Sequence, residues 1–177
     1  MIYKILYKLS TFKISDKLGG NDTYPVPFWF TWLARQRKWT PTQQMLRYSR
    51  MVDGRDLSFL APDELGCAES VSRIWNTLFG LPVFTSTIQM FAYMKNSGNF
   101  EELPKPVDGC ITIAVTDFRD GVTIHGHTGV SDKDGLWNNT SRYGKWLYNW
   151  TQEGFKRYFH EIRKLSVHHF IIRSRVY

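Results

Sequence analysis

The feature that most constrains the fold is a change in apolar periodicity at residues 104–109. Before this Pro- and Gly-containing segment, apolar residues recur three or four positions apart, as on one face of an α-helix. After it, they lie in short runs separated by Asp-Gly pairs at 120–121 and 134–135, as in antiparallel strands joined by turns. Helices that precede strands predict an α+β domain, with N-terminal helices packed on a small antiparallel sheet.

The local signals also predict where these elements begin and end. Thr40-Pro41 is typical of a helix start, Gly80 followed by Pro82 of a helix end, and Ser86 with Gln89 of a capping box. We expect helices over residues 40–52, 67–80, 86–96 and 151–165, a three-stranded meander over 110–117, 122–131 and 135–140, and a closing strand over 167–173.

The chain is long enough for one domain. Its 177 residues, 42% of them apolar and 16% aromatic, suffice to fill a single core, which we expect over residues 21–177. Residues 1–20 place apolar side chains at helical spacing with lysines between them and end in Gly19-Gly20. This pattern predicts an amphipathic N-terminal extension that docks on the body or on a partner.

The composition excludes several classes of protein. No run approaches the roughly 20 apolar residues that a membrane helix needs. Lysines interrupt the apolar residues at the N-terminus too often for a signal peptide, so we expect synthesis in the cytoplasm. The two cysteines, Cys67 and Cys110, stand in unlike contexts and do not suggest a disulfide framework.

The net charge of +7 and the pI near 9.5 favour a polyanionic partner. Nucleic acid, an anionic membrane or a bacterial cell wall would each satisfy this condition. The basic residues are dispersed rather than gathered in one stripe, which is more typical of a solvated surface than of a nucleic-acid interface. They include Arg35, Arg37, Lys38, Arg47, Arg50, Lys156, Arg157, Arg163, Lys164, Arg173 and Arg175.

Cys67 and His127 carry the strongest chemical signal. Cys67 opens the helix predicted over 67–80, and His127 lies in the strand predicted over 122–131. A thiolate nucleophile needs a lowered pKa and a nearby proton acceptor, which a helix N-terminus and an imidazole can supply together. The pattern therefore indicates a cysteine hydrolase.

Other residues have simpler interpretations. His125 and His127 alternate on one strand and could ligate a metal, but no further ligands stand at a persuasive spacing, so we expect no metal or cofactor. His125 is the substitute for His127 if the strand register differs. Cys110 begins a strand and is expected to pack in the core. Glu69 is expected to complement the dipole of its helix rather than to perform acid-base chemistry.

Four segments, in order, resemble the NlpC/P60 and CHAP-like cysteine peptidases of the papain-like superfamily. A cysteine opens a helix at 66–71, and Asp108-Gly109 leads into a strand at 110–115. The histidine strand follows at 126–130 (Gly-His-Thr-Gly-Val), and Leu-Trp-Asn-Asn-Thr-Ser at 136–141 forms the next strand. The resemblance covers roughly residues 60–150 and implies a papain-like, NlpC/P60-type fold.

The resemblance also implies roles for individual residues. Cys67 would be the nucleophile, His127 the general base and then the general acid, and Asn138 or Asn139 the group that orients the imidazole. Since neighbouring strand residues point to opposite faces, only one of these asparagines can meet His127, and we favour Asn139. The chain has Gly66-Cys67-Ala68 where the family often has Asp-Cys-Ser, so oxyanion stabilisation there would depend on backbone N–H groups.

By this resemblance the substrate is bacterial peptidoglycan, cut by an endopeptidase or an N-acetylmuramoyl-L-alanine amidase. With no signal peptide expected, such an enzyme resembles a phage endolysin or a virion-associated lytic protein that reaches the cell wall at lysis or injection. A noncatalytic interaction or structural protein on the same fold is one alternative. A basic nucleic-acid-binding protein is another, although no nucleic-acid motif is recognised and nucleic acid is not the expected partner.

Overall fold

The computed structural model describes residues 25–62, 65–139 and 144–174, so the extension expected over residues 1–20 lies outside the described residues. The chain is α+β, as predicted. Helices α2 (Phe28–Gln36), α3 (Pro41–Met51), α4 (Cys67–Phe79) and α5 (Thr87–Asn96) come first. The strands follow: β1 (Phe100–Leu103), β2 (Ile111–Ala114), β3 (Asp117–Arg119), β4 (Val122–Ile124), β5 (His127–Asp132), β6 (Gly135–Asn139) and β7 (Trp146–Thr151). Helix α6 (Gln152–Lys156), the π-helix η2 (Arg157–Ile162) and strand β8 (Val167–Ile172) complete the order.

The main sheet has six strands in the order β1-β8-β2-β5-β6-β7, and all its pairs are antiparallel. The predicted meander is present as β2, β5 and β6. However, its first two strands are each interrupted, because β3 and β4 pair with each other in a separate two-stranded sheet. The sheet is also larger than expected, since neither β1 nor β7 was predicted.

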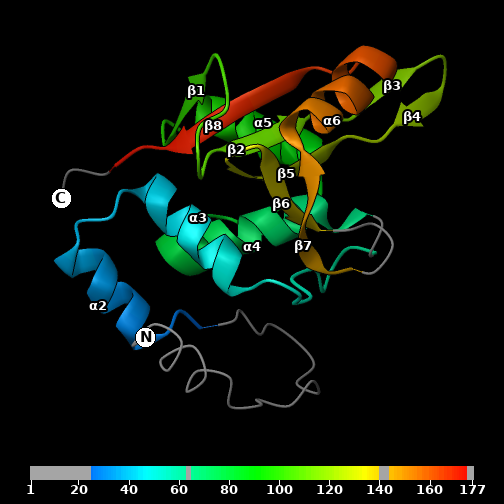
Figure 1. The fold of residues 1–177 in the computed structure, drawn as a ribbon. Helices are drawn as coiled ribbons and strands as arrows, with labels where there is room; N and C mark the ends of the chain where they lie inside the picture. Colours follow the sequence, from blue (N-terminus) through cyan, green and yellow to red (C-terminus); the bar gives the residue numbers. More distant parts are fainter. Residues whose placement is uncertain (1–24, 63–64, 140–143, 175–177) are drawn as a thin grey trace.

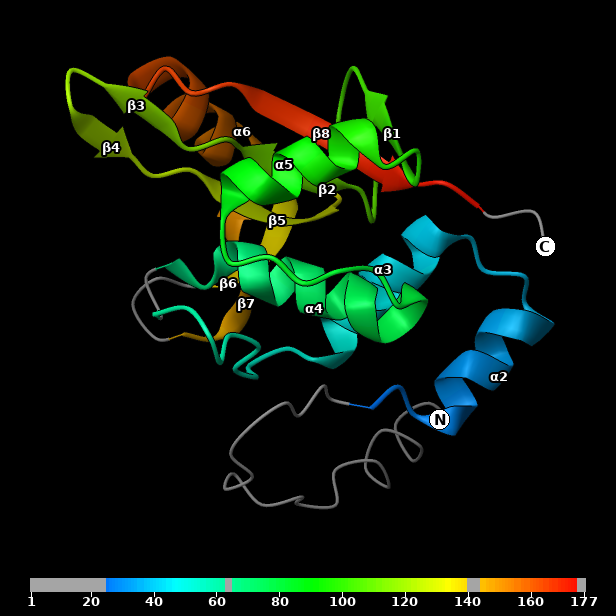
Figure 2. The ribbon, with the colours of Figure 1, turned by 180° about the vertical axis from the view of Figure 1, so that it is seen from behind.

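The two faces of the sheet pack against different helices. Ile111 and Ile113 of β2 lie in the larger core with side chains of α2, α3, α4 and α5, whereas Ala114 lies in a smaller core with Phe155 and Phe159 of α6 and η2. Figure 1 shows α3 and α4 on one side of the sheet and α6 on the other, and Figure 2 shows the same layers from behind. The alternation of strand side chains thus builds both cores from one sheet.

The helix boundaries follow the predicted signals. Thr40 Oγ1 accepts a hydrogen bond from the Gln43 amide, and Gln43 Oε1 accepts one from the Thr40 amide, a complete capping box ahead of α3. Gly80 ends α4 in the left-handed conformation with φ 69°. Ser86 caps α5, but its hydroxyl accepts from the Ile88 amide, so the predicted capping box with Gln89 is wrong in detail.

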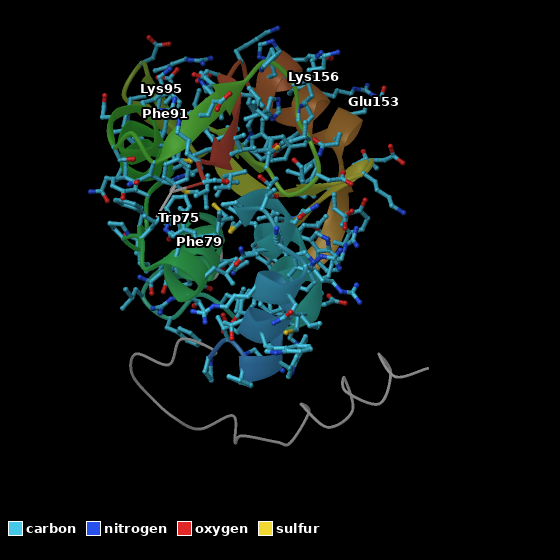
Figure 3. All side chains as sticks on the ribbon, turned by 90° about the vertical axis from the view of Figure 1, so that its left-hand side faces the viewer. Trp75, Phe79, Phe91, Lys95, Glu153 and Lys156 are labelled. Carbon is cyan, nitrogen blue, oxygen red and sulfur yellow. The ribbon has the colours of Figure 1, made fainter. Side chains whose placement is uncertain are left out.

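Two regions differ from the prediction. Helix α2 forms in an aromatic stretch for which no helix was predicted. The expected helix over 151–165 changes to a π-helix after Lys156, and Ile162 is 62% exposed although Phe155 and Phe159 are buried. The wider π-helical turn moves each later side chain around the axis. In Figure 3, Glu153 and Lys156 of α6 lie well apart from Trp75 and Phe79 of α4.

Most tryptophans of the described residues are covered by other side chains. Trp146 is fully buried, and Trp29, Trp39 and Trp137 are half-buried and pack against the larger core. Trp32 of α2 is 51% exposed. Within residues 25–62, 65–139 and 144–174, no helix has the length and apolar character to cross a membrane.

Candidate active site

Cys67 is the first residue of α4, and its side chain is 6% exposed. The helix forms here because Val71, Ile74 and Trp75 place a buried apolar stripe against the sheet. The preceding Gly66 is required by a close approach: a Cβ there would lie 2.5 Å from Ser58 Oγ and 3.0 Å from Asn139 Nδ2. The first-turn N–H groups of α4 therefore lie beside the thiol, where they favour negative charge.

His127 is the first residue of β5 and pairs with Ala114 of β2. Its half-buried ring stacks on Phe159, with ring centroids 5.7 Å apart and an interplanar angle of 8°. Phe155 contacts the same ring from α6, at a centroid distance of 6.2 Å. Phe155 and Phe159 thus pack against the imidazole.

The Cys67 thiol and the His127 imidazole each shift the pKa of the other, and both groups are enclosed by the fold. Burial alone would raise the pKa of the Cys67 thiol, but the charge and hydrogen bond of His127, with the amides of Thr128 and Ala68, bring it below its ordinary value. Burial alone would lower the pKa of His127, but the Cys67 thiolate and Asn138 raise it. The lowered pKa of the thiol and the raised pKa of the imidazole together favour a thiolate–imidazolium pair.

Asn138 completes a chain of three side chains. His127 Nε2 lies 3.0 Å from Asn138 Oδ1, and Asn138 Nδ2 donates to the Leu136 carbonyl at 3.2 Å. Because a carbonyl can only accept, it fixes which end of the amide faces the ring. Nε2 therefore carries a proton and donates to Oδ1, which leaves Nδ1 to exchange a proton with Cys67.

Asn139, the residue favoured for this role, does not meet His127. Its buried Nδ2 donates to Ser58 Oγ at 3.0 Å, to Ser70 Oγ at 3.1 Å and to the Gly144 carbonyl at 3.3 Å. The expectation that only one of the two asparagines faces the histidine is confirmed, but the choice between them was wrong. Asn139 instead ties the end of β6 to α4 and to the loop before it.

Glu69 has a larger role than complementing the helix dipole. Its carboxylate is fully buried and accepts hydrogen bonds from the amides of Phe59, Leu60 and Ala61 at 2.8 to 3.0 Å, and from Arg73 Nε at 2.7 Å. Burial would raise the pKa of this carboxyl, but these donors lower it. Glu69 thus holds the loop that precedes Cys67 against the first turn of α4. The sequence offers no signal for this contact, because the loop has no regular pattern.

The remaining candidates lie apart from this arrangement. The side chain of His125 is exposed, and its backbone carbonyl accepts from Arg163 Nη1. Cys110 is fully buried, and burial raises the pKa of its thiol. In the described part of the chain, no three His, Cys, Asp or Glu side chains gather where they could hold a metal ion.

Comparisons of the chain with protein-family models, with curated proteins and with solved structures found no match. The case for a function therefore depends on the geometry described above.

Proposed function

We propose that this protein is a cysteine hydrolase with a papain-like, NlpC/P60-type fold, and that it cleaves amide bonds in bacterial peptidoglycan in the manner of a phage endolysin. The proposal is supported above all by the arrangement of Cys67, His127 and Asn138: Cys67 and His127 shift each other's pKa, and His127 Nε2 lies 3.0 Å from Asn138 Oδ1. A thiol, an imidazole and a neutral amide in this order match the roles of nucleophile, base and orienting group in Cys-His-Asn peptidases.

In the proposed reaction, the two ring nitrogens of His127 have different roles. The Cys67 thiolate attacks the carbonyl carbon of the amide, and first-turn N–H groups of α4 stabilise the oxyanion. The amide C–N bond breaks as His127 Nδ1 gives its proton to the leaving nitrogen. His127 then takes a proton from water, which attacks the thioester and releases a carboxylate and the Cys67 thiolate. Asn138 keeps Nε2 protonated throughout.

Two properties support peptidoglycan as the substrate. The net charge of +7 suits a polyanionic cell wall. The order of the cysteine helix, the histidine strand and the following strand resembles that of enzymes that cut the peptide stem or the amide between peptide and sugar. Access to the wall at lysis or injection is part of the proposal.

The first experiment is loss of turbidity, or zymography, on purified peptidoglycan with the wild type, Cys67→Ser and His127→Ala. The proposal expects lysis by the wild type alone, and equal activity in all three would contradict it. Mass spectrometry of the fragments then separates endopeptidase from amidase. If the protein is instead a noncatalytic interaction protein, the Cys67→Ala variant should function as well as the wild type. If it binds nucleic acid, its affinity should fall steeply as the salt concentration rises.

A further inference from the structure

Asn149 of β7 occupies an irregular position in the sheet next to the candidate site. The pairing of β6 with β7 is regular from Gly135↔Thr151 to Leu136↔Trp150, and then shifts so that Trp137 pairs with Tyr148. Asn149 is thus the extra residue of a β-bulge. Bulges re-aim a side chain and occur often beside active sites.

The bulged side chain reaches the amide that holds His127. Asn138 Nδ2 donates to Asn149 Oδ1 at 2.6 Å, shorter than its 3.2 Å bond to the Leu136 carbonyl. The two acceptors together take both protons of the Asn138 amide nitrogen. The Asn138 oxygen is then the end that remains for His127 Nε2.

We propose that Asn149 is a positioning residue for the hydrolase: by accepting from Asn138, it keeps the Asn138 oxygen turned toward His127 and so fixes the tautomer of the imidazole. The inference rests on the proposed function. It adds a fourth member to the chain of side chains, one that touches neither the thiol nor the substrate.

Loss of this acceptor has a specific consequence. Without Asn149, Asn138 is held by the weaker bond to Leu136 and can turn its NH₂ group toward His127. Nε2 would then accept a hydrogen bond and could carry no proton. The ring would hold a proton on Nδ1 alone and could not form the imidazolium ion. The thiolate–imidazolium pair would lose its support, while the fold would change little because Asn149 is exposed.

The test compares Asn149→Leu, which removes the acceptor, with Asn149→Asp, which retains it, in the full chain. Asn96→Leu is the matched control, since Asn96 is an exposed asparagine on α5 whose side chain donates to the Ala92 carbonyl of the same helix. One readout is the imidazole nitrogen chemical shifts of His127, which report its tautomer. The other is the rate of alkylation of Cys67 by iodoacetamide against pH, resolved by peptide mass spectrometry.

We expect Asn149→Leu to slow alkylation of Cys67 about tenfold at mildly acidic pH, as for the loss of one hydrogen bond, and to alter the His127 shifts. Asn149→Asp and Asn96→Leu should match the wild type within about twofold, well inside the effect of one hydrogen bond. If the leucine variant does not fold, Asn149→Ala takes its place.

The inference is overturned if the leucine variant matches the wild type in both readouts, or if the aspartate variant is equally impaired. Neither readout needs peptidoglycan. A wild type that fails to lyse the cell wall, but whose Cys67 reactivity depends on Asn149, would contradict the proposed substrate and support the positioning role.

Discussion

The two cysteines of this protein are both buried and both lie near a histidine on the same sheet, yet their surroundings differ. Cys67 lies at the start of a helix, and the charge of His127 lowers the pKa of its thiol. Cys110 lies 3.9 Å from the hydroxyl of Thr112, and that hydroxyl, not the thiol, lies 2.9 Å from His169 Nδ1. A hydroxyl therefore separates the second thiol from the imidazole.

The consequence for charge is opposite at the two sites. Burial raises the pKa of the Cys110 thiol, and the hydroxyls of Ser131 and Thr112 do not offset it. Burial and the neighbouring His168 lower the pKa of His169, so this ring stays neutral, whereas the Cys67 thiolate helps to raise the pKa of His127. The two sites thus differ in that a neighbouring imidazole and backbone donors lower the thiol pKa of Cys67, whereas among the described residues no such imidazole offsets the burial of Cys110.

The largest expected effect is the difference in lysis rate between substitutions at the two cysteines. Cys67→Ser should reduce peptidoglycan lysis at least about a thousandfold, because the nucleophile and its ion pair are lost together. Cys110→Ser, the matched change at the second site, should leave the rate within about threefold, as is usual away from the reacting atoms. The measurement is the rate of turbidity loss with both variants shown to be folded. Equal rates in the two variants would remove the distinction between the cysteines.

Glu69 tests whether the Cys67 site depends on the loop that precedes it. Glu69→Ala should lower the free energy of unfolding by about 3 kcal/mol, because Arg73 and three amides lose a buried partner. The measurement is chemical denaturation. Glu69→Gln is the control, because it keeps the shape of the side chain and removes the charge.

The pH dependence of this effect has a defined sign. The folded state lowers the pKa of Glu69 below its ordinary 4.5, so its contribution is complete above that pH and declines as the pH falls through the folded value. The stability difference between wild type and Glu69→Gln should shrink on acidification. A difference that grows instead would contradict the assigned partners.

The neighbouring asparagines should differ in their effect on activity. Asn138→Ala should slow lysis about tenfold, from the loss of one hydrogen bond to a charged ring, and should also cost about 1 kcal/mol of stability because the Leu136 carbonyl and Asn149 lose a donor. Asn139→Ala should cost about 2 kcal/mol of stability, because Ser58 and Ser70 lose a buried donor, and should leave the lysis rate of the folded protein nearly unchanged. The measurements are lysis rates and denaturant midpoints on both variants. If Asn139→Ala slowed lysis and Asn138→Ala did not, Asn139 would have the role that the sequence predicted.

The smallest expected effect is on stability, at Thr112 beside Cys110. Thr112→Val should destabilise the fold by about 1 kcal/mol, since Ser131 and His169 lose a hydrogen-bond partner. It should leave the lysis rate unchanged. A change in lysis without a change in stability would indicate that the Cys110 site contributes to activity.

Much of this arrangement could be predicted from the sequence where the signals are local. Thr40 and Gly80 mark helix ends by their own conformational preferences, and β8 follows from a short apolar run. The pairing of Cys67 with His127 was expected from chemistry, since a thiol at a helix start needs a base. These inferences need no knowledge of how the strands align.

The rest depends on strand register, which no local signal reports. Whether Asn138 or Asn139 faces His127 is set by the alignment of β6 with β5, and a shift of one residue exchanges them. Asn149 acquires its role from a bulge in β7, a strand that was not predicted. The contacts of Glu69 join a helix to an irregular loop, and only the folded chain brings them together.

The most direct test of the proposed thiolate is the ionisation of Cys67 against pH, followed by the ultraviolet absorbance of the thiolate in wild type, His127→Ala and Cys67→Ala. We expect an absorbance step in the wild type well below the ordinary 9.0 of a thiol, absent from Cys67→Ala and moved upward in His127→Ala. A wild-type thiol that ionises at or above its ordinary value, unaffected by the loss of His127, would show that His127 does not activate Cys67.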